Sequence, residues 1–305
     1  MHTPMQTSKP LSYRAAFVMM IAAATLWSIA GVFTRHLDEA RGFEITFWRS
    51  GVTAVFVLAT LVCREKSNVV RSVRKVGAIG ILSGLFWGAM FSCFMMALTM
   101  TTVANTMVMD SIVPFLTAIA AWIFLKQRTP LRTWVAIGLA SLGIIWMFAG
   151  SMAEFGTTHL AGMLVALAVP FSATGNFIIL QKAGHQTDLI PTVFLGALFS
   201  ACFMLPLAWP LQSSWHDIGI MALLGVFQLG VPCILLVIAS RALSAPEISL
   251  IAMLEIVLAP LWAWLGAGEV PASATLIGGG FVLLALILNE VAMLRQLKRM
   301  KQDFS

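Results

Sequence analysis

The feature that most constrains this chain is the recurrence of apolar runs about twenty residues long, separated by short polar breaks. A run of this length crosses the hydrocarbon core of a bilayer as an α-helix. The sequence predicts ten such spans, at 14–36, 44–63, 76–98, 103–125, 132–150, 159–181, 190–209, 216–240, 246–268 and 273–294. The longest break between them, residues 64–75, is too short for a soluble domain. The predicted fold is therefore an all-α membrane protein.

Composition excludes a soluble enzyme. Hydrophobic residues make up 59% of the chain and charged residues only 10%, whereas soluble domains are roughly 45–50% apolar and about 25% charged. The four cysteines form no C-x-x-C motif, and all five histidines fall outside the spans or at their ends. We therefore expect no metal site, no cofactor and no catalytic residues.

The distribution of basic residues predicts the orientation. All but three of the 19 Lys and Arg residues fall on one side of the predicted spans, and the exceptions are Arg35, Arg41 and Arg49. By the positive-inside rule, both termini are cytoplasmic. This bias accounts for the net charge of +6 without a nucleic-acid partner. Residues 295–305 are predicted to form a basic cytoplasmic tail that contacts anionic lipid.

A weak internal repeat relates the two halves of the chain. "WSIAGVF" (27–33) resembles "FSATGNF" (171–177), and "GLFWG" (84–88) resembles "GVFQL" (225–229), both at an offset of about 140 residues. Each half, 14–150 and 159–294, holds five spans, and because five is odd the second half must insert upside down. Two inverted five-helix repeats are an architecture of secondary transporters, whose substrate site lies near the bilayer midplane.

Three stretches carry a resemblance to a known family. They are "LWSIAGVF" (26–33), "FWRSGVTAVF" (47–56) and "ALSAPEISLIAMLEIVLAPLWAWLGAGE" (242–269). With them the chain resembles the EamA family of the drug/metabolite transporter superfamily, which implies a ten-helix transporter fold. Two departures stand out: Ile256 occupies the place of the usual proline, and "FLKQR" (124–128) replaces a usual Gly-Glu. The richness in Trp and Met most resembles YddG-type exporters of aromatic and other amino acids.

Two acids lie inside predicted spans. Asp110 is seven residues into the fourth span and Glu255 nine into the ninth, which places them roughly 10 and 13 Å below opposite interfaces. Charge at such depth marks a candidate functional site. Either acid can bind a substrate ammonium or exchange a proton. Alternatively, each is a packing group hydrogen-bonded to a neighbouring span or to Arg49.

Prolines follow the candidate polar residues at a helical spacing. A proline cannot donate to the carbonyl four residues earlier, so Pro114 frees the carbonyl of Asp110 and Pro232 frees that of Gln228. Pro260 follows in the ninth span. The three prolines are candidate hinges, and the alternative is a structural kink alone.

The remaining candidate substrate-binding residues are apolar side chains and small polar groups at mid-span. The apolar candidates are Trp27, Phe86, Trp87, Met90 and Met107, with Phe177 beside them, and Met suits adaptable surfaces. The polar candidates are Ser28, Ser111, Ser172, Asn176 and Gln228. Core packing is the alternative for the apolar group, and bonding to their own helix backbone for the serines.

Other intramembrane residues are assigned structural roles. The other eight tryptophans, Trp262 among them, are expected in the interfacial aromatic belts. Gly80, Gly84 and Gly88 form a stripe expected to pack closely on another helix. Arg49 is expected to snorkel to an interface. A nucleotide-sugar carrier would need basic residues at mid-depth, and the sequence predicts none there.

Together these features predict a secondary transporter that exports small amphiphilic metabolites, most of all aromatic or other amino acids, by alternating access through a central cavity. The alternative is a multidrug exporter of lipophilic cations. An intramembrane enzyme would need a nucleophile and base, or metal ligands, at depth. The expected partners are a small-molecule substrate, protons as a candidate coupling ion, and membrane lipids. The expected state is a monomer or weak homodimer in the bacterial inner membrane.

Overall fold

The computed structural model describes residues 11–303, apart from positions 35, 39, 41, 102, 150–156, 184–186 and 269. Side chains at 67, 103–105, 157–160, 267 and 297–303 are also outside the description. The main elements are α1 (Tyr13–Ser28), α2 (Ala30–Thr34), α3 (Gly42–Glu65), α4 (Val69–Lys75), α5 (Gly77–Met100), α6 (Val103–Asp110), α7 (Val113–Leu125), α8 (Leu131–Phe148), α9 (Thr157–Ala183), α10 (Ile190–Ala208), α11 (Trp215–Leu223), the π-helix η3 (Leu224–Gly230), α12 (Val231–Ala239), α13 (Ala245–Ala252), α14 (Leu254–Ala267) and α15 (Ser273–Asp303).

The prediction of an all-helical fold with ten spans is confirmed. Within the described residues, ten helical stretches are long and apolar enough to cross a membrane, and no strand is present. We number them as spans in chain order. Four consist of more than one element: the first (α1 and α2), fourth (α6 and α7), eighth (α11, η3 and α12) and ninth (α13 and α14). The last helix continues to Asp303, past the predicted end of its span at 294.

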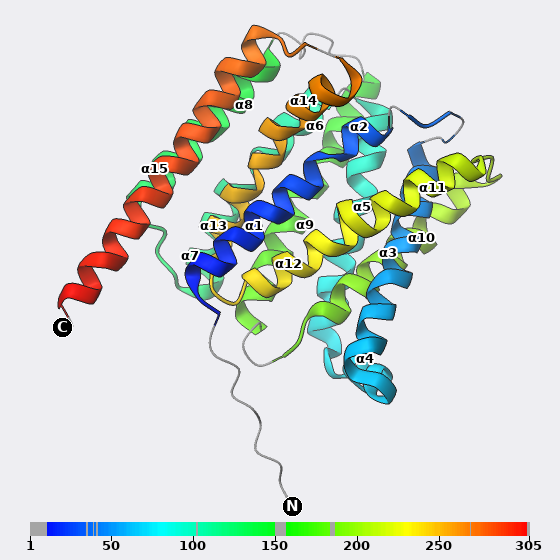
Figure 1. The fold of residues 1–305 in the computed structure, drawn as a ribbon, viewed down its shortest axis with the longest axis horizontal. Coiled ribbons are helices and arrows are strands. Elements are labelled where there is room, and N and C mark those ends of the chain that lie inside the picture. The colour runs from blue at the N-terminus through cyan, green and yellow to red at the C-terminus, as the bar shows by residue number, and fades with distance from the viewer. Residues whose placement is uncertain are drawn as a thin grey trace, which may run out of the picture.

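The helices form a bundle with two peripheral pairs (Figure 1). At one edge α15 lies along α8, and at the other α3 packs on α10. Between them, α9 packs on α5 and α7, while α1 packs on α12, α13 and α14. The third and fourth spans thus pack on the sixth, as the eighth and ninth pack on the first. A two-fold relation between the first five and the last five spans requires this exchange of partners.

Glycines allow the closest helix contacts. A Cβ on Gly196 of α10 would collide with the Trp87 side chain of α5 and lie 3.0 Å from the carbonyl oxygen of Gly84. Gly88 faces the same turn of α10, where a Cβ would lie 3.1 Å from the oxygen of Gly196. Gly84 and Gly88 therefore form the predicted packing face, because only hydrogen atoms fit between the two backbones.

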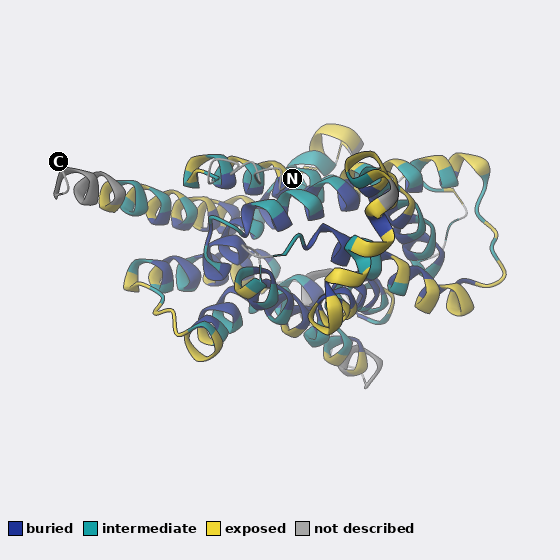
Figure 2. Ribbon diagram, turned by 90° about the horizontal axis from the view of Figure 1, so that it is seen from below, coloured by how far each residue is buried: buried dark blue, intermediate teal, exposed yellow. Residues whose placement is uncertain are grey.

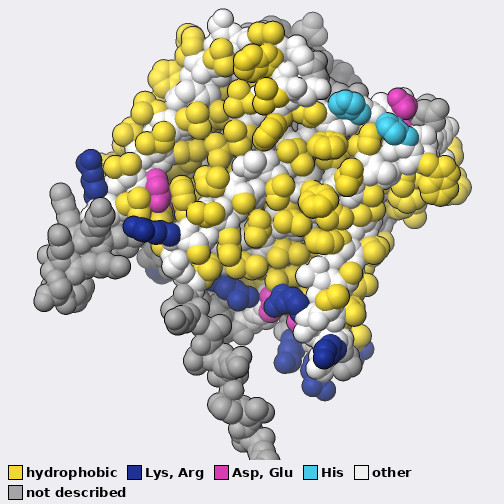
Figure 3. Space-filling view, in the orientation of Figure 1, with side chains coloured by type: hydrophobic (Ala, Val, Ile, Leu, Met, Phe, Trp, Pro, Cys, Tyr) yellow, Lys and Arg dark blue, Asp and Glu magenta, His cyan; other side chains and the backbone are white. Residues whose placement is uncertain are grey.

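The outer surface is that of a membrane protein. Figure 3 shows a broad hydrophobic face, with Lys and Arg side chains along its lower edge. Many large apolar side chains point outward, among them Val55, Phe124, Leu142 and Phe203. Seen from below, the exposed residues lie mainly on the outside of the bundle and the buried ones inside it (Figure 2). An apolar outer surface of this extent is stable only in contact with lipid.

Candidate functional site

Four spans lose regular α-helical structure within their length, and each break places polar groups inside the bundle. The fourth span turns at Ser111 and Ile112, between α6 and α7, where Pro114 occupies the first turn of α7. The eighth span winds into the π-helix η3, and Pro232 then opens α12. Since a proline has no N–H to donate, Pro114 and Pro232 leave the carbonyls of Asp110 and Gln228 without their usual helical partner.

The first and ninth spans are broken as well. The first turns at Ile29, between α1 and α2, and the ninth turns at Met253, between α13 and α14. Pro260 lies inside α14, seven residues after that turn. Backbone groups freed at membrane depth must be met by protein or by a water-filled cavity. The four breaks therefore concentrate hydrogen-bonding capacity at the centre of the bundle.

Asp110 and Glu255 stand at two of these breaks, within electrostatic reach of each other. Asp110 is the last residue of α6, and Glu255 is the second residue of α14. Both carboxylates are close enough for their charges to interact, although 145 residues of chain separate them. Both residues are partly exposed despite their depth in the bundle. Two acids whose charges interact inside the bundle can bind one cation between them or exchange a proton.

Arg49 lies inside the bundle, which corrects the expectation that it snorkels to an interface. The residue is only 5% exposed, and its Nη1 donates to Oε1 of Gln228 in the π-helix at 3.2 Å. The Gln228 amide in turn donates to the carbonyl oxygen of Trp27 at 3.4 Å, next to the break in the first span. The prediction that every basic residue lies near an interface is therefore wrong. This chain of bonds joins the second, eighth and first spans.

Trp262 joins the ninth span to the first. It lies near the end of the ninth span (Ala245–Gly266), so its place in an interfacial belt stays a prediction, and its indole Nε1 donates to Oγ of Ser28 at 2.9 Å. Ser28 is 3% exposed, and its hydroxyl donates to the carbonyl of Thr25 at 2.6 Å. On the same side of this break, the side chain of the preceding residue, Trp27, interacts with the thiol of Cys233. Both tryptophans thus lie at the junction of the first span with the eighth and ninth.

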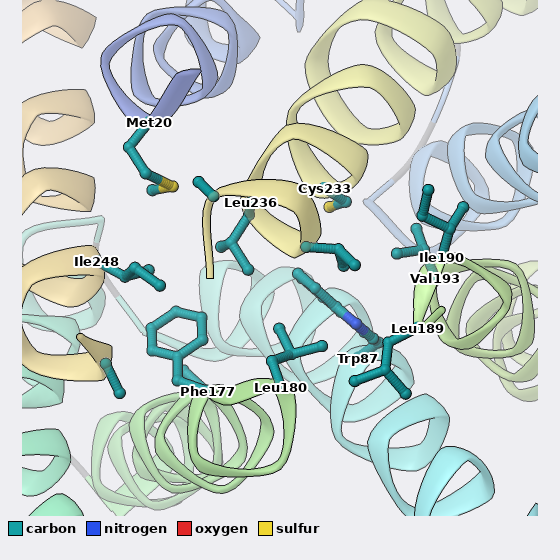
Figure 4. Packing of buried hydrophobic residues seen from close by; sticks show 14 of the residues in the cluster. Met20, Trp87, Phe177, Leu180, Leu189, Ile190, Val193, Cys233, Leu236 and Ile248 are labelled. Carbon is teal, nitrogen blue, oxygen red and sulfur yellow. The ribbon is translucent and has the colours of Figure 1, made fainter. Parts of the chain in front are cut away.

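The other apolar candidates divide between core and partly exposed positions. Figure 4 shows Trp87 of α5 and Phe177 of α9 in one buried cluster with Cys233 and Leu236 of α12. Trp87 is fully buried, and its indole nitrogen has no hydrogen-bond partner in the described structure. Phe86 is partly exposed and its ring covers Gly175 of α9, where a Cβ would lie 2.6 Å from it. The remaining two, Met90 and Met107, are partly buried against separate core clusters.

The predicted small polar residues mostly bond within the bundle. Ser83 of α5 donates to the amide oxygen of Asn176 on α9 at 2.6 Å, and Asn176 is fully buried. The Ser111 hydroxyl donates to the carbonyl of Val108 at 2.7 Å, at the break of the fourth span. Ser172 is 7% exposed. Of this group, Ser28 and Gln228 form side-chain hydrogen bonds between broken spans: Ser28 accepts from Trp262, and Gln228 donates to the Trp27 carbonyl.

The two halves of the fourth and ninth spans have different neighbours. In the half nearer the basic 126–132 loop, α7 packs directly against α13. On the other side of the breaks, α6 packs on α5, α8 and α9, whereas α14 packs on α1, α2 and α15. Asp110 and Glu255 therefore lie between two regions of the fourth and ninth spans. On one side of the acids these spans contact each other through α7 and α13, and on the other side α6 and α14 pack on different helices.

A ten-span helical bundle with broken helices and opposed acids at its centre has the architecture of a secondary transporter. The chain belongs to the EamA-like transporter family, which it matches over residues 14–149 and 160–290. It is thus a multi-pass membrane transporter and not an enzyme.

Curated relatives and a solved structure agree with this assignment. The pseudopaline exporter CntI of Pseudomonas aeruginosa is 24% identical over 285 residues, which cover 90% of this chain and 95% of that protein. Solute carrier family 35 member G1 of Mus musculus is 24% identical over 228 residues, 69% of this chain but only 60% of the mouse protein. A crystal structure with 14% identity covers 92% of this chain and 99% of its own with a TM-score of 0.78, which supports the fold alone. An inner-membrane location fits the bacterial relative.

Proposed function

We propose that this transporter exports small amphiphilic metabolites, most of all aromatic or other amino acids, across the bacterial inner membrane by alternating access. Both termini are placed in the cytoplasm, with 14–150 and 159–294 as inverted repeats and 295–305 as a basic cytoplasmic tail. The exchange of packing partners between the two sets of five spans supports the repeat, and the distribution of Lys and Arg supports the orientation. The name of the bacterial relative supports export as the direction.

The observation that carries the proposal is the pairing of Asp110 with Glu255 at two helix breaks. Two acids whose charges interact inside an apolar bundle form a receptor for a cationic group. A primary ammonium can donate to both carboxylates at once, since it offers three N–H donors. Protons are the candidate coupling ion, because the same pair can take up a proton once the ammonium has left.

Alternating access is supported by the difference between the two ends of the site. On the basic side, which we place in the cytoplasm, α7 is in contact with α13, while α6 and α14 pack on different neighbours beyond the acids. The irregular segments at Ile29, Ser111–Ile112, η3 and Met253 offer places where the spans can bend. Pro114, Pro232 and Pro260 remain the proposed hinges.

The other candidate substrate-binding groups favour an amphiphile over a sugar. Trp27, Phe86 and Met90 offer partly exposed apolar surface, and Met107 does so beside α6. Ser28, Ser111 and Gln228 supply polar groups at the breaks. We assign lesser, packing roles to the buried Trp87, Ser172 and Asn176, which bound the site from the core side.

Reconstitution in liposomes tests the proposal. Liposomes that contain the purified protein are loaded with a panel of labelled amino acids, and release is measured with and without a pH gradient. Quaternary ammonium compounds serve as the comparison. We expect aromatic amino acids to cross the membrane faster than in protein-free liposomes, and faster still with the pH gradient. Movement of quaternary cations in the absence of amino-acid transport would contradict the amino-acid proposal and favour the cation exporter.

A further inference from the structure

Arg49 is a charge enclosed in the membrane-spanning part of the protein. It lies seven residues after the start of α3 at Gly42, about 10 Å along the helix axis at 1.5 Å per residue. Only 5% of the residue is exposed. Burying a guanidinium without an anionic partner is costly, so such residues are commonly paired or belong to a functional site.

The partners of Arg49 in the protein do not neutralise it. Nη1 donates to the neutral amide oxygen of Gln228, and Nε is buried with no hydrogen-bond partner in the described structure. None of the ion pairs found among the described residues includes Arg49. A guanidinium has five N–H donors in a planar fork that matches a carboxylate. Arg49 therefore retains unused capacity for an anion.

The surrounding structure holds the guanidinium in position. Gly225 of η3 lies against α3 so closely that a Cβ there would be 2.7 Å from the carbonyl oxygen of Arg49. This approach brings the π-helix to the Arg49 side chain and allows Gln228 to bond both Arg49 and the Trp27 carbonyl. π-Helical segments are frequent at functional sites. Arg49 is thus tied to two of the spans that are broken at mid-depth.

Cys233 of α12, which contacts Trp27, links Arg49 to the acids. The Cys233 thiol is within electrostatic reach of Arg49 and also of Glu255, and Glu255 in turn is within reach of Asp110. The centre of the bundle therefore has a cationic end at Arg49 and an anionic end at Asp110 and Glu255. The Trp27 side chain interacts with the same Cys233 thiol.

We propose that Arg49 binds the carboxylate of the transported solute, while Asp110 and Glu255 bind its cationic group. This inference rests on the proposed export function and narrows its substrate class to zwitterions and other carboxylate-bearing amphiphiles. A lipophilic cation would leave the charge of the Arg49 guanidinium without a partner. An uncharged solute would leave both Arg49 and the two acids without one. Charge complementarity at two ends gives selectivity, because a solute that lacks either charge leaves a buried group unpaired.

Three probes of one shape test the proposal. Phenylalanine carries both charges, phenylpropionate lacks the ammonium, and phenethylamine lacks the carboxylate. Binding is measured by isothermal titration on the full chain in lipid nanodiscs, for the wild type, Arg49→Met and Arg49→Lys. Arg14→Met is the matched control, since Arg14 is an exposed arginine at the start of α1.

We expect Arg49→Met to weaken binding of phenylalanine and phenylpropionate at least tenfold and that of phenethylamine less than twofold. Arg49→Lys keeps the charge but not the fork, so its loss is smaller. Equal weakening of all three probes, or unchanged carboxylate binding by a folded Arg49→Met protein, overturns the inference. Should Arg49→Met fail to fold, Arg49→Lys provides the test. A ratio of phenylpropionate to phenethylamine affinity equal to that of the wild type would then contradict carboxylate binding by Arg49.

The two proposals fail separately. Arg49-dependent binding of phenylpropionate, without transport of any amino acid, keeps the carboxylate site and removes amino-acid export. Amino-acid transport by a folded Arg49→Met protein that still prefers phenylalanine to phenethylamine keeps export and removes the Arg49 site. A wild type that binds neither carboxylate probe also overturns the Arg49 assignment.

Discussion

The indole Nε1 of Trp262 donates a 2.9 Å hydrogen bond to Oγ of Ser28, joining the ninth span to the first beside the point where the first is broken. The Ser28 hydroxyl uses its own proton on the carbonyl of Thr25. Its acceptor capacity therefore serves the other span. Glu255 lies two turns earlier on the same helix as Trp262, so this bond fixes the position of the acid-bearing helix relative to Trp27.

Replacing Trp262 by phenylalanine isolates this bond. The change keeps an aromatic ring but removes the indole N–H, and we expect it to lower the free energy of unfolding by about 1 kcal/mol. Transport should fall, because α14 is then less well held against α1. Thermal unfolding in detergent and uptake by liposomes measure the two effects. The matched control is Trp264→Phe, since Trp264 is 49% exposed, and equal losses in both variants would contradict the assignment.

The acid pair gives a prediction in which stability and transport change differently. Asp110→Asn or Glu255→Gln removes one of two like charges that interact, so the free energy of unfolding should not fall and is expected to rise slightly. Transport should nevertheless drop at least tenfold, and the double variant should lose any stimulation by a pH gradient. Scanning calorimetry and liposome uptake provide the measurements. A marked loss of stability together with normal transport would make the acids packing groups.

Pro114 is predicted to affect the rate of transport more than binding. Pro114→Ala restores a donor to the carbonyl of Asp110 and favours a continuous helix through Ser111 and Ile112. We expect slower exchange with solute affinity changed less than threefold, as measured by uptake kinetics and equilibrium binding. Pro206→Ala is the matched control, because Pro206 also lies within a helix but is exposed on α10. Similar rate losses in both variants would show a general effect on helix stability.

The sequence predicted the spans well because each is a long apolar run, and membrane thickness fixes how long such a run must be. The depth of single residues was harder to predict. The place of Arg49 near the start of the second span predicts that it snorkels to an interface, whereas its side chain turns inward and donates to Gln228 of η3. That contact joins residues 179 positions apart, and no local sequence signal indicates it.

Contacts between distant segments could not be predicted from the sequence. The partner of Trp262 is Ser28, 234 residues away, and a tryptophan near a span end is equally compatible with an interfacial belt. The break at Met253 has no proline within its turn, and Pro260 lies later in an unbroken helix. The position of that break therefore depends on packing against the neighbouring spans rather than on a local sequence signal.

The contact between α8 and α15 provides a prediction about packing with a control on the same helix. A Cβ on Gly278 would collide with the carbonyl oxygen of Gly143 and with the Met147 side chain, while a Cβ on Gly280, two residues on, would meet no atom within 4 Å. Backbone cannot yield as a flexible side chain does, so Gly278→Ala must separate the two helices. We expect a loss of about 1–3 kcal/mol in the free energy of unfolding, as for other overpacked sites.

Gly280→Ala should instead be neutral or stabilise by up to about 1 kcal/mol, because alanine is the better helix former. Thermal unfolding of both variants in one detergent measures the difference. Equal stability of the two variants would contradict the close approach of α8 and α15.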